Sequence, residues 1–253
     1  MTEPEQIQTN PVTFQVQKHF GPFMGQVICP DDILLAFKNM SNKILEDKTS
    51  KSHGGSLAGK IETELRVYRR DVIEFGIDRF LEGCVRSYVI ECAKQHNYLH
   101  EGVTIQTSVN SAWIVSQYAG EYNPLHSHTG CEVSGVLYIN VPNVKGRRKY
   151  VHDNKNKSDS DGNIIFPYSS ASQRQNDVLE GGVLEFEPKE GLMIIFPSYL
   201  LHTVYPFLGE GERRCLAFNA NYRGVITKDN SYLFGNFEGY KNNLFYSEEK
   251  PNE

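Results

Sequence analysis

The stretch Tyr122-Asn-Pro-Leu-His-Ser-His-Thr-Gly130, followed by the apolar run Val133-Ser-Gly-Val-Leu-Tyr-Ile-Asn140, decides the fold. A second apolar run, Phe196-Pro-Ser-Tyr-Leu-Leu-His202, also ends in a histidine. Side chains two residues apart on an extended chain point the same way, so His126 and His128 can reach one metal ion from one strand end. His202 must then come from a neighbouring strand. Three protein ligands leave coordination positions open, which is typical of a catalytic metal site.

Each histidine taken alone has a simpler explanation. His126 and His128 can be loop histidines, and His202 can be a hydrogen-bonded core histidine. The three together, each at the edge of a β-rich apolar run, favour a metal site. The other histidines have no partner at ligand spacing, and we expect them to be surface or core residues: His19, His53, His96, His100 and His152.

The hydrophobic pattern predicts helices first and strands later. Helical spacing is found over 29–40 and over 61–96, whereas 12–17 alternates like a strand. After residue 103 come short apolar runs separated by Gly, Pro and Asn, which predict strands over 112–119, 133–140, 182–186, 192–196 and 215–219. This order is typical of a double-stranded β-helix, or jelly roll, with helices packed outside it. We expect residues 1–105 to pack on a core formed by 106–253, as one structural domain.

Composition limits the class of protein. The chain has 253 residues and a net charge of -5, so it offers no basic surface for nucleic acid. Its five cysteines are scattered without CxxC spacing, which favours free thiols in a reducing compartment. The sequence shows neither a leader pattern nor an apolar run of 18 residues, so we expect a cytoplasmic protein with no membrane contact.

A polar segment separates the two apolar runs that carry the histidines. It extends from Val144 to Glu180 and is rich in Lys, Arg, Asn and Asp. A connection of this length in a compact domain is usually either functional or disordered. The sequence leaves two interpretations open: a mobile surface excursion, or a lid at the mouth of the barrel that grips the substrate.

The order of these motifs resembles the 2-oxoglutarate/Fe(II)-dependent oxygenase superfamily. The resemblance covers roughly 110–222 and is carried by the His-x-His pair, Leu-Tyr-Ile-Asn, Gly-Gly-Val-Leu-Glu-Phe, the run ending at His202, and Glu-Arg-Arg-Cys-Leu-Ala-Phe-Asn. It is strongest with the prolyl-4-hydroxylase-like branch and its small oxygenases, many of them from phages and marine bacteria. If the chain is viral, its expected location is the host cytoplasm.

The resemblance implies a role for several residues. It places metal ligands at His126 and His202, and at His128 in the position of the usual Asp or Glu. Glu132 is the nearest carboxylate that could replace it. A cation for the distal carboxylate of the co-substrate falls on Arg213 or Arg214. Strand alternation favours Arg213, because Cys215, Ala217 and Asn219 share its face and leave space for a ligand. Further co-substrate contacts fall on Tyr138, Tyr118 and Ser134, with Asn123 and Asn219 at the border of the site.

The resemblance implies an Fe(II)- and 2-oxoglutarate-dependent dioxygenase that uses O2, with ascorbate as a further candidate cofactor. Such an enzyme would hydroxylate a small-molecule or peptide substrate and release succinate and CO2. Two alternatives remain open from the residues: a cupin-like three-histidine dioxygenase that needs no 2-oxoglutarate, and a catalytically silent jelly-roll binding module. Neither the substrate nor the oligomeric state follows from the sequence.

Overall fold

The computed structural model describes residues 14–18, 21–56, 59–142, 160–168, 183–229 and 231–235. Its helices are α1 (Asp31–Glu46), the 3-10 turn η1 (Gly54–Ser56), α2 (Arg69–Glu74) and α3 (Asp78–Gln95). Its strands are β1 (Phe14–Lys18), β2 (Phe23–Ile28), β3 (Thr63–Val67), β4 (Val103–Gln117), β5 (Asn123–His126), β6 (Val133–Asn140), β7 (Ile164–Pro167), β8 (Val183–Phe186), β9 (Leu192–Pro197), β10 (His202–Val204), β11 (Arg213–Ile226) and β12 (Tyr232–Gly235).

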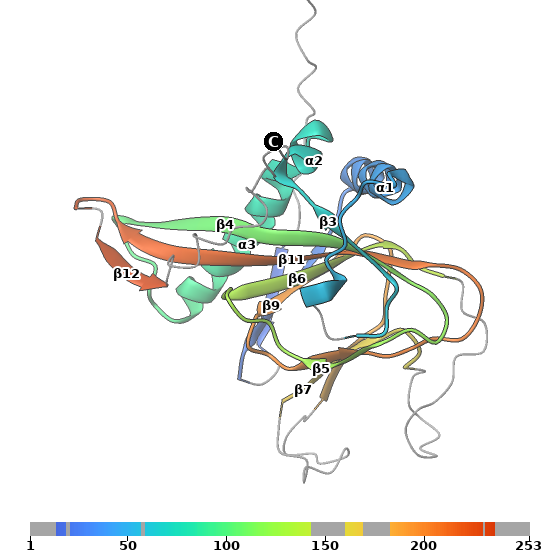
Figure 1. Ribbon diagram of the computed structural model, residues 1–253. Helices are drawn as coiled ribbons and strands as arrows, with labels where there is room; N and C mark the ends of the chain where they lie inside the picture. The colour runs from blue at the N-terminus through green and yellow to red at the C-terminus, as the bar shows by residue number, and fades with distance from the viewer. Residues whose placement is uncertain are drawn as a thin grey trace, which may run out of the picture.

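Two antiparallel sheets form the core. The large sheet has the order β1-β2-β9-β6-β11-β4-β3, with β12 paired to β11, and the small sheet has the order β5-β10-β7-β8. The helices lie on one side of the large sheet and the strands of the small sheet on the other (Figure 1). The predicted jelly roll with flanking helices is therefore confirmed.

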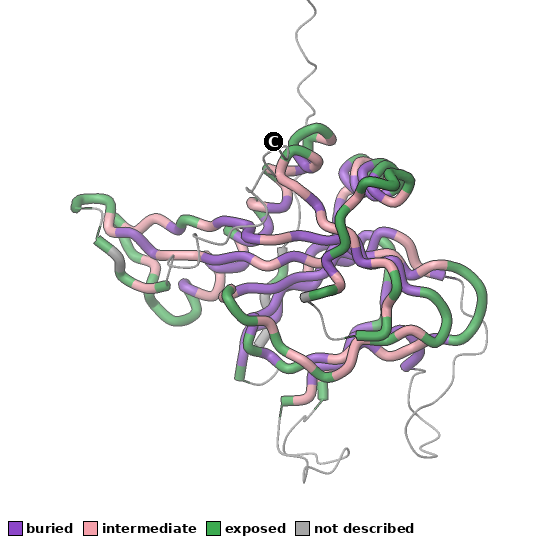
Figure 2. The backbone as a smooth tube through the Cα atoms, viewed as in Figure 1, coloured by how far each residue is buried: buried purple, intermediate pink, exposed green. Residues whose placement is uncertain are grey.

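Alternation along the strands of the large sheet produces two separate apolar cores. Leu137, Leu216 and Phe218 point outward and pack with residues of α1 and α3. Tyr138 and Cys215, one residue along on the same strands, point inward and pack between the two sheets. Both faces of the central strands are thus buried, as the purple colouring of the inner strands in Figure 2 shows. The inward face is the one that can line a site.

Helix α1 begins and packs as its sequence predicts. It starts at Asp31 with two acidic residues in its first turn, where a negative charge stabilises the helix dipole. Its predicted apolar positions are all buried: Ile33, Leu34, Phe37 and Met40. Arg214 also holds α1 to the sheet, because it donates to the buried Ser41 and the exposed Asn42 of the helix.

Two parts of the sequence prediction need correction. The expected helical region 61–96 contains a strand, β3, before α2 and α3 begin. The polar segment 144–180 is not one continuous connection, because it contains the strand β7. This strand pairs with β10 and with β8, which both follow the segment. Of that segment the structure describes 160–168 alone, so the lid interpretation otherwise falls outside the described residues.

Close packing between β6 and β11 leaves no room for a side chain at Gly135. A Cβ there would lie 2.2 Å from the ring of Phe218, its partner in the register of the two strands. We expect Gly135→Ala to lower the free energy of unfolding by about 1–3 kcal/mol, measured by urea denaturation. Gly83→Ala on α3, where a Cβ meets nothing within 4 Å, should instead be neutral or slightly stabilising. Equal effects at both positions would contradict this packing.

Candidate active site

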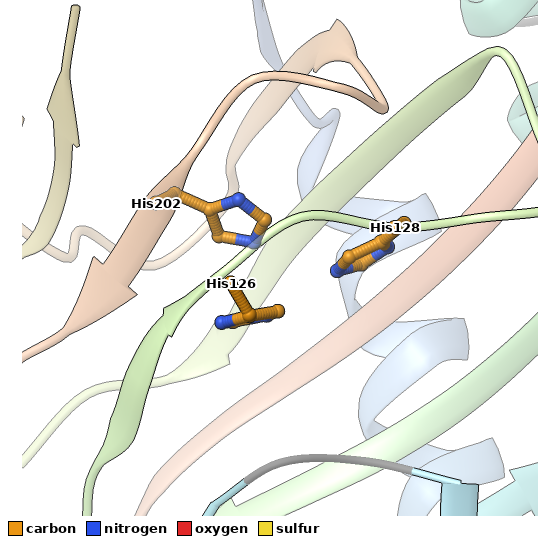
Figure 3. A group of neighbouring side chains, drawn as sticks. All are labelled: His126, His128 and His202. Carbon is orange, nitrogen blue, oxygen red and sulfur yellow. The ribbon is translucent and has the colours of Figure 1, made fainter.

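Three histidines meet at one end of the space between the sheets. His126 ends β5, His128 follows two residues later, and His202 begins β10, where it pairs with His126 in the strand register. Each offers a ring nitrogen, and these nitrogens all lie within 4.8 Å of one another. Figure 3 shows the three rings turned toward a common space from two neighbouring strand ends. One ion held at about 2.1 Å from each nitrogen would need small side-chain movements only.

Hydrogen bonds set the same tautomer in all three rings. Nδ1 of His126 lies 2.7 Å from the Pro124 carbonyl, and Nδ1 of His202 lies 2.9 Å from the Leu200 carbonyl. Nδ1 of His128 lies 2.6 Å from Oδ1 of Asn219. These oxygens accept and do not donate, so each Nδ1 carries a proton, and Nε2 is the atom with the free lone pair in the neutral ring. In that form the site presents three nitrogen ligands.

Burial keeps two of these rings uncharged. It lowers the pKa of His202 to about 3, and His126 and His128 lower it further. Burial also lowers the pKa of His128, although its bond to Asn219 works in the opposite direction. Neutral rings at physiological pH suit metal binding, because a proton on the ligand nitrogen competes with the ion.

No carboxylate joins this group among the residues that the structure describes. Glu132, the alternative ligand, is turned away, and its Oε2 accepts a hydrogen bond from the backbone N–H of Tyr222 at 3.0 Å. The protein ligands therefore leave the two positive charges of a divalent ion uncompensated. An anionic co-ligand would be attracted more strongly here than to a site with its own carboxylate.

Arg213 and Arg214 lie on opposite faces of β11. Arg214 is outside, where it pairs with Glu212 at 2.6 Å and reaches α1. Arg213 is inside and 2% exposed, and its Nη1 donates to Gln117 at 3.0 Å. Its Nε and Nη2 have no hydrogen-bond partner. A fully buried guanidinium with two free donors fits a carboxylate, which binds such a fork with two parallel bonds.

Tyr138 lies beside Arg213 and adds another unpaired donor to the inner core. The guanidinium carbon of Arg213 lies 4.9 Å from the centre of the Tyr138 ring, and the tyrosine hydroxyl is buried without a partner. Burial raises the pKa of Tyr138 to about 12, so the hydroxyl keeps its proton and can donate. The unpaired donors of Arg213 and Tyr138 thus fit one carboxylate group of a ligand.

The remaining predicted contacts lie in different places. Ser134 is fully buried beside the metal centre, where its hydroxyl donates to Asn219 at 2.8 Å and lies 3.0 Å from Nδ1 of His128. Tyr118 follows the end of β4, is 52% exposed, and donates its backbone N–H to Glu121. This placement gives no support to the predicted contact of Tyr118 with the co-substrate. Asn123 stands in β5 and its carbonyl accepts from Thr203.

Several polar residues near the site were missed by sequence reasoning. His53 is buried and stacks on Trp113 at 4.6 Å between ring centres, and Trp113 in turn lies 5.9 Å from His128. Glu64 and Arg66 of β3 come from a stretch that was predicted to be helical. Asp161 is buried with both carboxylate oxygens unpartnered, and it lies in the polar segment that carried no periodic signal.

A cavity of about 590 Å³ adjoins His128 on the side of α3. Six aromatic side chains contribute to its wall: Phe23, Tyr88, Tyr98, Tyr199, Tyr222 and Phe234. Among the residues that the structure describes, Glu132 is the one carboxylate in the lining, and no lysine or arginine lines it.

Comparison with known proteins agrees with this geometry. Residues 111–219 match the family model described as "Putative 2OG-Fe(II) oxygenase". No curated protein matches the chain. Among solved structures, a Pseudomonas putida prolyl-4-hydroxylase is 15% identical, with a TM-score of 0.44 over 81% of this chain and 91% of its own. A prolyl hydroxylase from Trichoplax adhaerens, solved with a hypoxia inducible factor peptide, is 13% identical, with a TM-score of 0.46 over 81% and 83%.

The resemblance inferred from the sequence is therefore confirmed for the segment that contains the three histidines, Tyr138 and Arg213. The family match covers this core, residues 111–219, and the family is one of oxidoreductases that use Fe(II) and 2-oxoglutarate. In the described part of the chain, every helix is too short or too polar to cross a membrane.

The metal ligands can be tested one by one. We expect His126→Ala, His128→Ala and His202→Ala each to abolish stoichiometric Fe(II) binding, because two imidazoles remain in each case. His128→Asp should keep or tighten Fe(II) binding, since it restores a two-histidine, one-carboxylate set. Metal content of anaerobically purified protein is the measurement, with the exposed His100→Ala as control. Retention of metal by His128→Ala together with its loss in Glu132→Ala would refute the ligand set.

Acidification should destabilise the metal-free protein. The folded pKa values of His202, about 3, and His53, about 4, lie below the ordinary value of 6.5. The unfolded chain therefore binds more protons below pH 6.5, and stability falls as pH decreases, by up to about 1.4 kcal/mol per pH unit for each ring. Glu64, with a folded pKa of about 7, acts in the opposite direction between its ordinary 4.5 and 7.

The slope of unfolding free energy between pH 6.5 and 5 measures this effect. It should be flatter in His202→Gln and in His53→Gln, and unchanged in His100→Gln, whose ring is exposed. An unchanged slope in both buried variants would show that these rings titrate normally in the folded state.

Proposed function

We propose that the protein is a hydroxylase that couples oxidation of its substrate to decarboxylation of 2-oxoglutarate, with release of succinate and CO2. The observation that carries this proposal is Arg213: a fully buried cation with two free donors, beside an unpartnered Tyr138 hydroxyl, inside the same barrel as three convergent histidines. Buried charges without partners are costly, so such a group indicates a missing anion.

The three histidines are the proposed ligands of Fe(II). Fe(II) held by these three residues would supply the oxidising power for O2 activation, with one oxygen atom of O2 going to succinate and the other to the substrate. In each ring Nδ1 donates a hydrogen bond, to Pro124, Leu200 or Asn219, so Nε2 is the nitrogen available to the metal.

Arg213 and Tyr138 are proposed to bind the distal carboxylate of 2-oxoglutarate. Gln117 holds the guanidinium in place by accepting from Nη1, which leaves Nε and Nη2 free. The surrounding apolar side chains of the inner core exclude water. Such a dry setting strengthens the bond between the guanidinium and the carboxylate.

The two alternatives predict different behaviour. A three-histidine dioxygenase without 2-oxoglutarate would form no succinate, and it would give no ligand for the two unpaired donors of Arg213. A silent binding module would not bind Fe(II) in stoichiometric amounts. The unpaired donors of Arg213 favour the 2-oxoglutarate enzyme over both.

Anaerobic calorimetry with 2-oxoglutarate tests the co-substrate site. We expect Arg213→Ala to weaken binding by at least about 100-fold, because it removes a buried charge-assisted pair. Arg214→Ala is the matched control and should bind normally, since its side chain lies on the outer face. Wild-type protein supplied with Fe(II) and O2 should form succinate from 2-oxoglutarate. Normal binding by Arg213→Ala, or no succinate from metal-loaded wild type, would reject the proposal.

A further inference from the structure

A second group of polar side chains lines the barrel on the side of Trp113. In β3, Glu64 pairs with Val115 of β4, and Arg66 pairs with Trp113. Val115 and Trp113 belong to the inner core. Residues opposite each other on neighbouring strands share a face, so Glu64 and Arg66 also face inward.

This polar group contains three buried atoms that have no partner. Oε1 of Glu64, Nε of Arg66 and Nδ1 of His53 make no hydrogen bond. The whole residues Glu64 and His53 are 4% and 6% exposed. The structure records no ion pair between Glu64 and Arg66 among the residues it describes. Buried polar groups nearly always have partners, so three orphans at adjacent positions indicate a missing ligand.

The group is close to the metal centre. The ring of His53 is stacked on Trp113 at an angle of 24°, and Trp113 contacts the ring of His128. The backbone N–H of His53 donates to the Glu64 carbonyl at 2.8 Å, which ties this segment to β3. Two ring contacts thus separate the orphaned atoms from a proposed metal ligand.

We propose that Glu64, Arg66 and His53 bind the substrate, and that this substrate is a free α-amino acid. Arg66 binds its carboxylate, Glu64 binds its ammonium group, and its side chain extends past Trp113 toward the metal centre. His53 offers Nδ1 to either charged group. This inference rests on the proposed function, because it takes the three-histidine centre as the site of oxidation.

Charge and spacing favour a zwitterion over other substrates. Glu64 and Arg66 stand two residues apart on one face of β3, about 7 Å along the strand, so an unpaired acid and an unpaired base face the same side. A residue inside a peptide carries neither terminal charge, and a peptide end carries one. In the described residues, the cavity that adjoins His128 is lined by Glu132 but by no arginine or lysine, so it offers no cation for the carboxylate.

The environment of the group fits this division of roles. Burial raises the pKa of Glu64 to about 7, and Glu121 adds to the effect, so a bound cation would stabilise the ionised carboxylate. Burial lowers the pKa of His53 to about 4, and Arg66 and His128 lower it further. A neutral His53 does not repel the ammonium group.

Trp113 provides the readout, because it is the single tryptophan of the chain and stacks on His53. The full-length protein is loaded with Zn(II) and 2-oxoglutarate, which prevents turnover, and titrated with each of the twenty standard L-amino acids. We expect at least one to change Trp113 emission in a saturable way. Its N-acetyl derivative and its methyl ester, each lacking one charge, should bind at least about 10-fold more weakly.

Variants assign the two charges. Glu64→Gln and Arg66→Gln should each weaken binding of the amino acid by at least about 10-fold. Glu64→Gln should not further weaken the N-acetyl derivative, and Arg66→Gln should not further weaken the methyl ester. The exposed Glu62→Gln and Arg70→Gln are matched controls and should bind like wild type. Urea denaturation confirms that each variant is folded.

Three results would overturn the inference: no response to any amino acid, derivatives that bind as tightly as the parent amino acid, or an equal loss in the control variants. Calorimetry with 2-oxoglutarate on the same proteins separates this failure from failure of the proposed function. Normal 2-oxoglutarate binding without an amino-acid response rejects the amino-acid site alone. Loss of 2-oxoglutarate binding in wild type rejects the enzyme assignment, whatever the emission of Trp113 shows.

Discussion

The register of β11 is the constraint on which the rest of the structure depends. This strand pairs with β4 along its length and with β6 over its first half, so its alternation sets both faces of the large sheet. Arg213 and Asn219 point inward to the proposed co-substrate and metal positions, whereas Arg214 and Phe218 point outward to α1 and the outer core. A slip by one residue would bury the pair of Arg214 and Glu212 and expose the inner arginine.

The parts of the site that depend on local chain geometry could be predicted from sequence. The two-residue spacing of His126 and His128, and the choice between Arg213 and Arg214, both follow from strand alternation. Two of the metal-site histidines are also oriented locally, each by the carbonyl two residues before it. His128 is different, because Asn219 orients it from 91 positions further along the chain. The sequence placed Asn219 at the border of the site, but no local pattern links it to His128, so this hydrogen bond became visible in the fold alone.

The elements that were missed have two physical causes. In β3, Leu65 and Val67 alternate with Glu64 and Arg66, but the strand is five residues long and its Glu and Arg are residue types that favour helices, so it was taken as part of the helical region that follows it. In β4 the pairing with β11 skips Asn110, and this bulge reverses which residues face inward. The sequence therefore predicted the part of β4 after the bulge and missed the part before it. Polar residues at functional positions and bulges thus make the strands that build a site harder to predict from sequence.

The interior of the barrel carries two groups of unpaired polar atoms besides the histidines. One group belongs to Arg213 and Tyr138, and the other to Glu64, Arg66 and His53. Each unpaired group lowers the stability of the empty protein, because its hydration is lost and not replaced. Ligands that pair with these groups bind the folded state alone and so restore that stability. The same atoms thus make the empty barrel costly to fold and select the charged molecules that enter it, which links the stability of this protein directly to its chemistry.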